Sequence, residues 1–237
     1  MLTDDSRAID TRHLGFTMSP HEECGVEEAV RLIETNKGDS VALTLGPPEA
    51  VEQLRDAMAL GIDRAIHLQT DGQEWDAEAT AAAITDAIRA DEAANGSFDI
   101  IFFGNESADS GGFQVGIWVA YALGRPCVTG LKKVTLEGAS VRCEQEVEGG
   151  RDVYVVPLPA VLTVKEGLNL PRYPSVPGKM RARSKPVAVT SPARPAPRLE
   201  LINLAVPAGQ GRRAESLGIG AAAAPAVVDL LQKTGVL

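Results

Sequence analysis

The sequence predicts an α/β fold in which a parallel sheet is covered by helices on both faces. Three observations favour this class. In the first half, apolar runs of strand length alternate with stretches of helical periodicity. The stretch from Phe98 to Gly124 places a polar, glycine-bearing loop between a buried-type strand and a helix start. After Arg125, joints at Gly138 and Gly149 separate strand-like runs, which predicts an antiparallel extension of the sheet.

The elements of the first half begin after residues 1–18, which are polar and show no clear element. Ser19 is a good helix cap, Pro20 suits the first turn, and Glu22 lies near the positive end of the helix dipole. These signals predict a helix over 20–36. A strand over 40–45, a helix over 49–60, a strand over 64–68 and a helix over 75–94 follow in order.

The central stretch predicts a strand over 98–103, a polar loop over 105–112 and a helix from Phe113 to Gly124. Such a loop is where open α/β sheets bind ligands, and glycines there let a phosphate approach the backbone. Asp109 can accept hydrogen bonds from a ribose, and Gln114 offers both a donor and an acceptor. An ordinary strand–helix turn is an equally good interpretation of these residues, because the loop has neither GxGxxG spacing nor a P-loop lysine.

The second half predicts strands over 128–136, 140–147, 152–156 and 159–164. A proline-punctuated loop over 168–185 follows, with a short helix around 178–184. Residues 186–225 are rich in Pro, Ala and Arg and predict an extended arm, which a helix over 225–233 closes. We therefore expect one domain over 1–185 and an arm over 186–237 that packs on a partner.

Composition restricts the function classes. The three cysteines show no paired or metal-binding spacing, so we expect reduced thiols, no metal site and a cytoplasmic protein. No stretch has the pattern of a signal peptide or a membrane span. Residues 1–110 hold 23 acidic and 7 basic side chains, whereas residues 165–213 hold 2 acidic and 10 basic ones. The basic segment has few aromatic residues, so an acidic protein partner fits it better than nucleic acid.

No catalytic constellation stands out among the reactive side chains, since no Ser-His-Asp, Cys-His or paired-carboxylate pattern is present. His67 lies in a predicted strand, so we expect a core histidine. His21 lies at a helix start, where an exposed side chain and a ligand contact are equally good interpretations.

Several stretches together resemble the small (beta) subunit of electron-transfer flavoprotein. The most specific is the strand Leu158-Pro-Ala-Val-Leu-Thr-Val164 followed by the loop Leu168-Asn-Leu-Pro-Arg-Tyr-Pro-Ser-Val-Pro177. Arg142, Glu146 and Gly149-Gly150 match the hairpin ahead of it. Met18-Ser-Pro with Val26-Glu-Glu-Ala-Val-Arg-Leu32 is similar to the family's first helix, Gly46-Pro47 to the turn after its second strand, and Ala59-Leu-Gly-Ile-Asp-Arg-Ala65 to the next joint. The resemblance covers about Met18 to Lys185.

This resemblance implies a flavodoxin-like domain that pairs with a larger alpha subunit and carries electrons without turning over a substrate. It implies FAD held mostly by alpha, and a structural AMP or a second FAD in this subunit. Electrons would come from acyl-CoA or related flavin dehydrogenases and pass to a membrane quinone oxidoreductase, with no nucleic acid and no membrane insertion. A docking loop over 165–185 is implied to contact the dehydrogenase through Val176, with Tyr173, Lys179 and Arg181 beside it.

The cofactor-binding residues that the resemblance implies come from two helix starts, one strand end and the central loop. They are Ser19, Pro20, His21, Glu22, Leu45, Asn105, Glu106, Ser107, Ala108, Asp109, Ser110, Gly111, Gly112, Phe113, Gln114, Val115 and Gly116. Gly111, Gly112 and Gly116 would leave room for a phosphate.

Three departures from the family pattern bear on these expectations. The loop reads Ser107-Ala108-Asp109 where the family has Ala-Ile-Asp, and Ser19 stands where Asn is frequent. The apolar first strand of the family and its Lys-x-Val-Pro-like turn have no counterpart here, so we expect that the sequence starts late and that two inner strand edges lack a partner. The alternatives are a stand-alone adenine-nucleotide-binding protein or hydrolase of this fold, and a binding module for nucleic acid.

Overall fold

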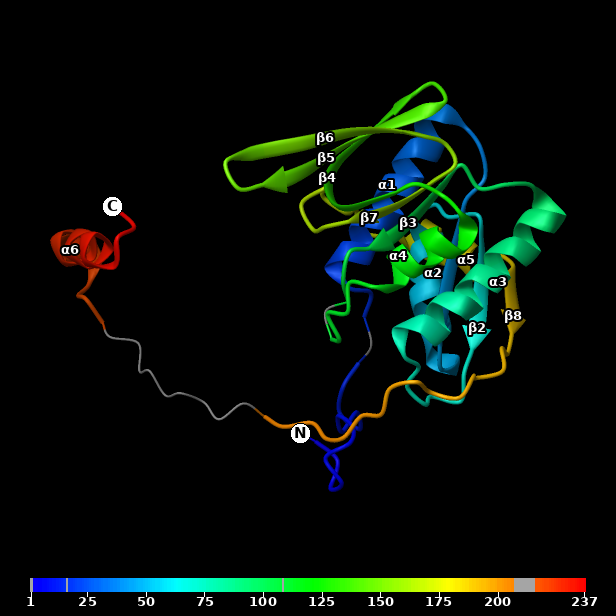
Figure 1. The fold of residues 1–237 in the computed structure, drawn as a ribbon, viewed down its shortest axis with the longest axis horizontal. Coiled ribbons are helices and arrows are strands. Elements are labelled where there is room, and N and C mark those ends of the chain that lie inside the picture. Colours follow the sequence, from blue (N-terminus) through cyan, green and yellow to red (C-terminus); the bar gives the residue numbers. More distant parts are fainter. Residues whose placement is uncertain (1, 16, 108, 207–215) are drawn as a thin grey trace. The chain divides into compact units, whose positions relative to one another are not determined.

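A computed structural model describes residues 2–15, 17–107, 109–206 and 216–237. The chain forms two compact units, one over residues 11–200 and one that joins residues 1–10 to residues 201–237. The larger unit alternates strands and helices as expected, and it is the mixed α/β, parallel-dominated fold that the sequence predicts (Figure 1). It carries every candidate site residue that the structure describes.

The first half of the larger unit follows the expected order, and every boundary lies within two residues of its predicted position. It contains α1 (Pro20–Asn36), β1 (Val41–Gly46), the 3-10 turn η1 (Pro48–Ala50), α2 (Val51–Leu60), β2 (Arg64–Gln69), α3 (Ala77–Asn95), β3 (Ile100–Gly104) and α4 (Val115–Leu123). Local chemistry sets several of these limits. Pro20 opens α1, the Asp76 carboxylate caps α3 by accepting from the Ala79 N–H at 2.8 Å, and Gly124 ends α4 in the left-handed conformation.

The second half builds the antiparallel extension that the glycine joints predict. It contains β4 (Cys127–Glu137), β5 (Ser140–Val147), β6 (Gly150–Pro157) and β7 (Ala160–Val164). β4 pairs with β5 and β5 with β6, both antiparallel, and the three strands project together in Figure 1. Gly138 and Gly149 take positive φ angles at the two hairpin turns, which explains why glycine stands at both joints.

The strands form two sheets in the described residues, with orders β1-β2-β8 and β3-β7-β4-β5-β6. β1 pairs with β2 alone, and β3 pairs with β7 alone, so each sheet has an inner edge strand, as expected from the departure at the start of the sequence. Residues 2–10 contribute an isolated bridge between Leu2 and Ile9 and no sheet strand.

The expectation that residues 186–225 form an arm throughout is wrong at its beginning. Residues Val187–Thr190 form strand β8, which pairs in parallel with β2. Its alternation is too short, and too close to Pro186, to distinguish it from a linker by pattern. The short helix α5 (Val176–Ala182) begins two residues earlier than predicted, with Val176 as its first residue and Ser175 as its cap.

Three apolar clusters hold the larger unit together. One lies between α1 and the five-stranded sheet, one joins α1, α2 and α5 to the other sheet, and one lies under α3 and α4. The third cluster receives side chains from both β1 and β3, which places the inner edges of the two sheets on one shared core. His67 is buried, with Nε2 at 3.2 Å from the Gly46 carbonyl oxygen, so the expectation of a core histidine is confirmed.

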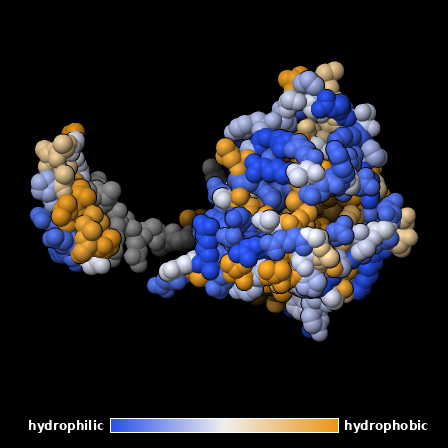
Figure 2. Space-filling view, turned by 90° about the horizontal axis from the view of Figure 1, so that it is seen from above, coloured by the Kyte–Doolittle hydropathy of each residue, from blue (hydrophilic) through white to orange (hydrophobic). Residues whose placement is uncertain are grey.

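The smaller unit contains the 3-10 turn η2 (Gly220–Ala223) and the helix α6 (Ala224–Thr234). The Leu204 N–H donates to the Ser6 carbonyl oxygen at 2.7 Å. α6 buries none of its residues, and it exposes Val227, Val228 and Leu230, seen as an orange patch on this helix in Figure 2. None of the helices in the described residues combines the length and apolar character that crossing a membrane requires.

Candidate functional site

A cavity of about 380 Å³ lies where the start of α1 meets the loop between β3 and α4. Ser19, Pro20 and His21 line it from α1, and Glu166 lines it from the residues after β7. The loop contributes Glu106, Ser107, Asp109, Ser110 and Gly111. The carboxyl ends of β3 and β7 therefore meet the amino end of a helix, which is the usual ligand position in an open α/β sheet.

The structure brings together eight of the residues that the sequence assigns to a cofactor, namely Ser19, Pro20, His21, Glu106, Ser107, Asp109, Ser110 and Gly111. Ala108 lies outside the described residues. Glu166 was missed, because it follows a buried strand with no motif around it; only its place two residues after the end of β7 could have indicated it.

The other assigned residues have structural surroundings of their own. The side chains of Leu45 and Val115 pack on the apolar cluster under α3 and α4. Asn105 fixes the loop to β7, since its Oδ1 accepts from the Thr163 hydroxyl at 2.8 Å and its N–H donates to the Val164 carbonyl oxygen at 2.9 Å. Gln114 is the N-cap residue of α4 and makes no side-chain cap bond there.

The expectation that Gly116 leaves room for a phosphate is wrong. A Cβ at Gly116 would lie 2.9 Å from Thr163 Cγ2 and 3.2 Å from Phe103 Cβ, so this glycine lets α4 pack closely on β7 and β3. Gly111 and Gly112 face open space, and there the expected room exists. Phe113 has a positive φ of 55°, so the chain turns sharply at this residue before α4. Half of the surface of Phe113 is exposed.

The electrostatics of the cavity are acidic. Glu106, Asp109 and Glu166 line it, and the described lining contains neither lysine nor arginine. The Ser107 hydroxyl and the Ser110 N–H lower the pKa of Asp109 from its ordinary value, although burial opposes them, so this carboxylate is charged at neutral pH. Lys132 donates to the backbone oxygen of Glu166 beside the cavity.

Hydrogen-bond donors come from the start of α1. Its first intrahelical bond runs from Glu23 N–H to the Ser19 oxygen, which leaves earlier N–H groups for a ligand. Two buried side-chain atoms, His21 Nδ1 and Glu22 Oε2, have no partner in the described structure. Unpaired buried polar atoms are costly, and His21 lines the cavity, so a bound group that pairs with His21 Nδ1 is favoured.

These residues fit the nucleoside part of a nucleotide cofactor. Ribose hydroxyls and an exocyclic amine are donors, and carboxylates accept from them. The fit to a phosphate is weaker, because the helix start attracts an anion while three carboxylates repel it. A phosphate bound here therefore needs a cation beyond the side chains that line the cavity.

A second candidate site is the segment over 168–185, for which the family resemblance implies a docking role. Tyr173 is 96% exposed and Val176 is 74% exposed, with Leu170 and Met180 also in solvent. Lys179 and Arg181 lie in the last turn of α5. Large exposed apolar side chains that gather on a short segment are typical of the central contact residues of protein interfaces.

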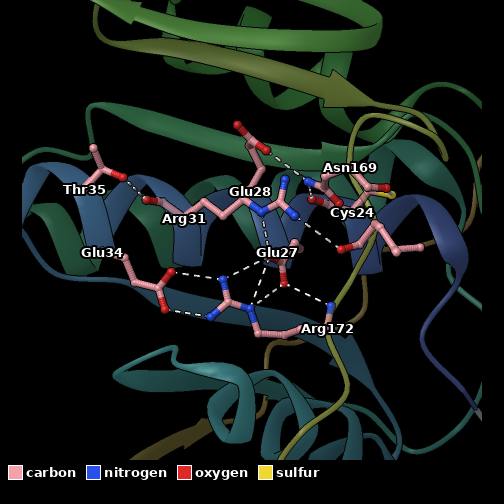
Figure 3. Close-up of polar contacts among 9 residues, drawn as sticks. Cys24, Glu27, Glu28, Arg31, Glu34, Thr35, Asn169 and Arg172 are labelled. Atoms are coloured by element: carbon pink, nitrogen blue, oxygen red, sulfur yellow. Dashed lines mark hydrogen bonds and ion pairs between the residues drawn. The ribbon is translucent and has the colours of Figure 1, made fainter.

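The segment is clamped to α1 by an ion-pair network (Figure 3). Glu27 is 1% exposed, and its Oε2 lies 3.0 Å from Arg172 Nε. Arg172 also binds the Glu34 carboxylate at 2.6 Å, and Arg31 Nε donates to Glu27 Oε1 at 2.7 Å. Asn169 Nδ2 donates to the Cys24 carbonyl oxygen at 3.0 Å. The backbone just before Tyr173 is thus fixed to α1 at two points, Asn169 and Arg172.

The pKa directions agree with this clamp. Burial works to raise the pKa of Glu27, but the hydrogen bonds from Arg172 and Arg31 outweigh it and lower that pKa. Bonds to Glu34 and Glu27 raise the pKa of Arg172. The pair is therefore ionised at neutral pH, as a structural ion pair must be.

A second clamp fixes α5 to α2. Arg55 Nη1 donates to the carbonyl oxygens of Ala182 and Lys185, at 2.6 and 2.7 Å. Lys185 Nζ donates to the carbonyl oxygens of Met58 and Ile62, where the helix leaves acceptors unpaired. Gly178 lies so close to Ala59 that an added Cβ would stand 2.5 Å from its backbone oxygen.

The basic arginines after β8 find partners in their own unit. Arg194 donates to the backbone oxygen of Glu74 at 2.6 Å, and Arg198 pairs with Glu78 at 2.7 Å. Part of the basic segment that we expected on a partner thus lies on the acidic start of α3.

Comparison with known proteins gives a consistent result. The family model described as electron transfer flavoprotein domain matches residues 7–195. The protein named electron transfer flavoprotein subunit beta from Bacillus subtilis is 36% identical over 174 residues, 73% of this chain and 66% of that protein. The proteins of that name from Mycobacterium tuberculosis and Mus musculus are each 35% identical, over 79% and 78% of this chain and 71% and 72% of their own lengths. The match thus spans about two thirds of the Bacillus protein.

Proposed function

The chain belongs to the electron transfer flavoprotein beta-subunit family, and we propose that it works as the smaller subunit of a heterodimer that carries electrons between flavin enzymes. The observation that carries this proposal is the clamped docking segment, which holds Tyr173 and Val176 in solvent on a rigid base. A carrier must bind its partners briefly and repeatedly. A preorganised anchor lowers the entropy lost in each encounter.

We propose that an alpha subunit completes the cofactor site. The flavin, FAD shared between the subunits, supplies the reversible uptake and release of electrons when it is bound. This chain contributes acceptors at Glu106, Asp109 and Glu166 and donors at the start of α1. The acidic lining supports a site whose cation comes from the other subunit. The nucleotide held by this chain itself would be AMP or a second FAD.

The docking segment is the proposed contact with an acyl-CoA or related flavin dehydrogenase. Val176 and Tyr173 would fill an apolar recess of that enzyme, while Lys179, Arg181 and Arg183 steer its approach. The electrons would then pass to a quinone oxidoreductase. No substrate is turned over by this chain in the proposal.

The C-terminal residues after β8 are the proposed arm on the alpha subunit. Leu199, Ile202 and Val206 are exposed on a segment without regular structure, and α6 exposes a stripe of its own. Apolar surface of this extent on a short segment favours a partner that covers it.

The proposal is tested by electron delivery. The chain would be reconstituted with its alpha subunit and mixed with a reduced acyl-CoA dehydrogenase, and bleaching of the flavin absorbance would be followed. Fast bleaching that requires both subunits is expected. Equal bleaching when this chain is left out of the mixture would remove it from the carrier role.

A further inference from the structure

A second cavity of about 380 Å³ opens where β2 and β8 end. The two strands are parallel neighbours, with Leu68 opposite Thr190, so their carboxyl ends meet at one edge of the sheet. Open α/β sheets place ligands at that edge. The described lining shares no residue with the cavity at the start of α1. It comes from the end of β2, the loop after it and the segment after β8, and consists of Gln69, Thr70, Asp71, Trp75, Ser191, Pro192 and Arg194.

The two walls of this cavity are fixed to each other by hydrogen bonds. Arg194, after β8, donates to the side-chain oxygen of Gln73 and to the backbone oxygen of Glu74, both in the loop after β2. The Thr70 N–H donates to the Gly46 carbonyl oxygen at 2.9 Å, which ties the start of that loop to the end of β1. The cavity is therefore preformed, and a ligand does not have to order its walls.

Two side chains of the lining offer hydrogen-bond donors to a ligand. Trp75 Nε1 is buried and has no partner in the described structure. An unpaired buried N–H is costly, so a ligand that brings an acceptor to it is favoured. The described hydrogen bonds of Arg194 go to two neutral oxygens, and a guanidinium carries five N–H groups. Arg194 therefore has N–H groups and a positive charge left for a carboxylate.

Asp71 contributes the opposite charge. It lines the cavity, and its Oδ1 accepts from the Gln73 N–H at 3.0 Å. The described lining thus contains one carboxylate and one guanidinium, and their formal charges cancel. An ion of either sign would meet one repulsive group, whereas a ligand that has both a carboxylate and an ammonium can pair with both groups. Trp75 and Pro192 add apolar surface to the same lining.

We propose that this cavity binds a free α-amino acid with an apolar side chain. The carboxylate of the ligand would accept from Arg194 and Trp75, and its ammonium would pair with Asp71. Its side chain would pack on Trp75 and Pro192. The volume of the cavity lies at the small end of the range of ligand sites, which suits a molecule of this size.

The experiment uses the full chain and follows the indole N–H of Trp75 by NMR. The chain has two tryptophans, Trp75 and Trp118, so the Trp118→Phe background leaves a single indole signal. L-leucine at millimolar concentrations should shift this signal in a saturable way. Isocaproate lacks the ammonium group of L-leucine, and isoamylamine lacks its carboxylate. Each should bind about tenfold more weakly or worse, because each leaves one charge of the cavity unpaired.

Three variants in the same background test the residues. Arg194→Gln should weaken L-leucine binding by about tenfold. Asp71→Asn should also weaken it, but should bind isocaproate more tightly than the parent chain does, because the repulsive carboxylate is gone. A variant that merely failed to fold would not show this gain. Arg89→Gln removes an exposed arginine of α3 outside the lining and should leave the affinity unchanged.

Three results would overturn the proposal. They are a Trp75 signal that L-leucine does not shift, equal binding of L-leucine, isocaproate and isoamylamine, and unchanged L-leucine affinity in Arg194→Gln. None of these measurements needs flavin or an alpha subunit, so the amino-acid site and the carrier function fail separately.

Discussion

At the scale of single residues, one buried carboxylate, Glu27, joins α1 to the docking segment. Glu27 lies in the core side of α1, and its charge is matched by Arg172 from a segment 145 positions later. A buried ion pair gives modest net stability, but breaking it is costly and its geometry is specific. In this molecule the Glu27–Arg172 pair fixes the position of the segment that exposes Tyr173 and Val176.

Glu27→Gln should lower the free energy of unfolding by about 1–3 kcal/mol at neutral pH, because Arg172 then loses its charged partner. The pKa of Glu27 is lowered in the folded chain from its ordinary value of 4.5. The contribution of the ionised carboxylate is therefore complete above that value and is lost as the pH falls through the lowered pKa. Thermal unfolding of both proteins over this range checks it, with the gap shrinking in acid.

Glu34→Gln is the matched control, because Glu34 binds the same arginine from an exposed position. Its effect on unfolding should be much smaller. A gap between wild type and Glu27→Gln that stays constant into strong acid would show that the carboxylate charge contributes nothing.

Val176→Glu tests the anchor. A carboxylate forced into an apolar recess costs at least about 1.4 kcal/mol, so electron transfer from the dehydrogenase should slow by about tenfold or more. Flavin content and thermal stability should not change, since Val176 is in solvent. Val155→Glu, an exposed valine on β6, is the control and should leave the rate unchanged. Wild-type kinetics for Val176→Glu would remove the segment from docking.

At the scale of elements, α5 is positioned by how closely it can approach α2. Gly178→Ala would bring a methyl group against the Ala59 backbone oxygen, and backbone cannot yield as a flexible side chain does. We expect a loss of stability of about 1–3 kcal/mol and a displaced docking segment. Gly15→Ala is the control, because nothing lies near its added Cβ. Chemical denaturation measures both, and equal midpoints would contradict the close approach.

Most elements of the fold could be predicted from the sequence, because the residues within and next to each element are enough to specify it. Pro20 and an apolar period predict helix α1, although the Ser19 side chain at its N-cap makes no capping hydrogen bond, and two glycines predict the β4–β6 hairpins. Strand β8 could not be predicted in this way. It is four residues long, it follows a proline, and its backbone hydrogen bonds form only when it pairs with β2. Which strand edges lack a partner is likewise a property of the assembled sheets, which the pattern alone does not give.

The candidate site likewise has parts that the sequence predicts and parts that only the folded structure shows. The loop over 105–112 could be placed at a sheet end because strand, glycines and helix are contiguous. Glu166 and the Glu27–Arg172 clamp could not, because they join residues far apart in the chain by side-chain geometry. The space-saving role of Gly116 against Thr163 needed the packed structure for the same reason.

At the scale of the whole molecule, the features describe a subunit with unfinished surfaces. Three carboxylates and no described lysine or arginine line the cavity, the docking segment is clamped but exposed, and α6 buries none of its residues. A partner that covers these surfaces and supplies a cation would explain all three features, as the proposed function requires.

The most direct measurement of the central claim is the flavin content of the chain before and after it is combined with its alpha subunit. Purified alone, the chain should carry little flavin, because its own groups cover only part of the cofactor. Purified with the alpha subunit, it should elute as a one-to-one complex with flavin absorbance. A full equivalent of flavin on the isolated chain, or no complex with the alpha subunit, would contradict the account.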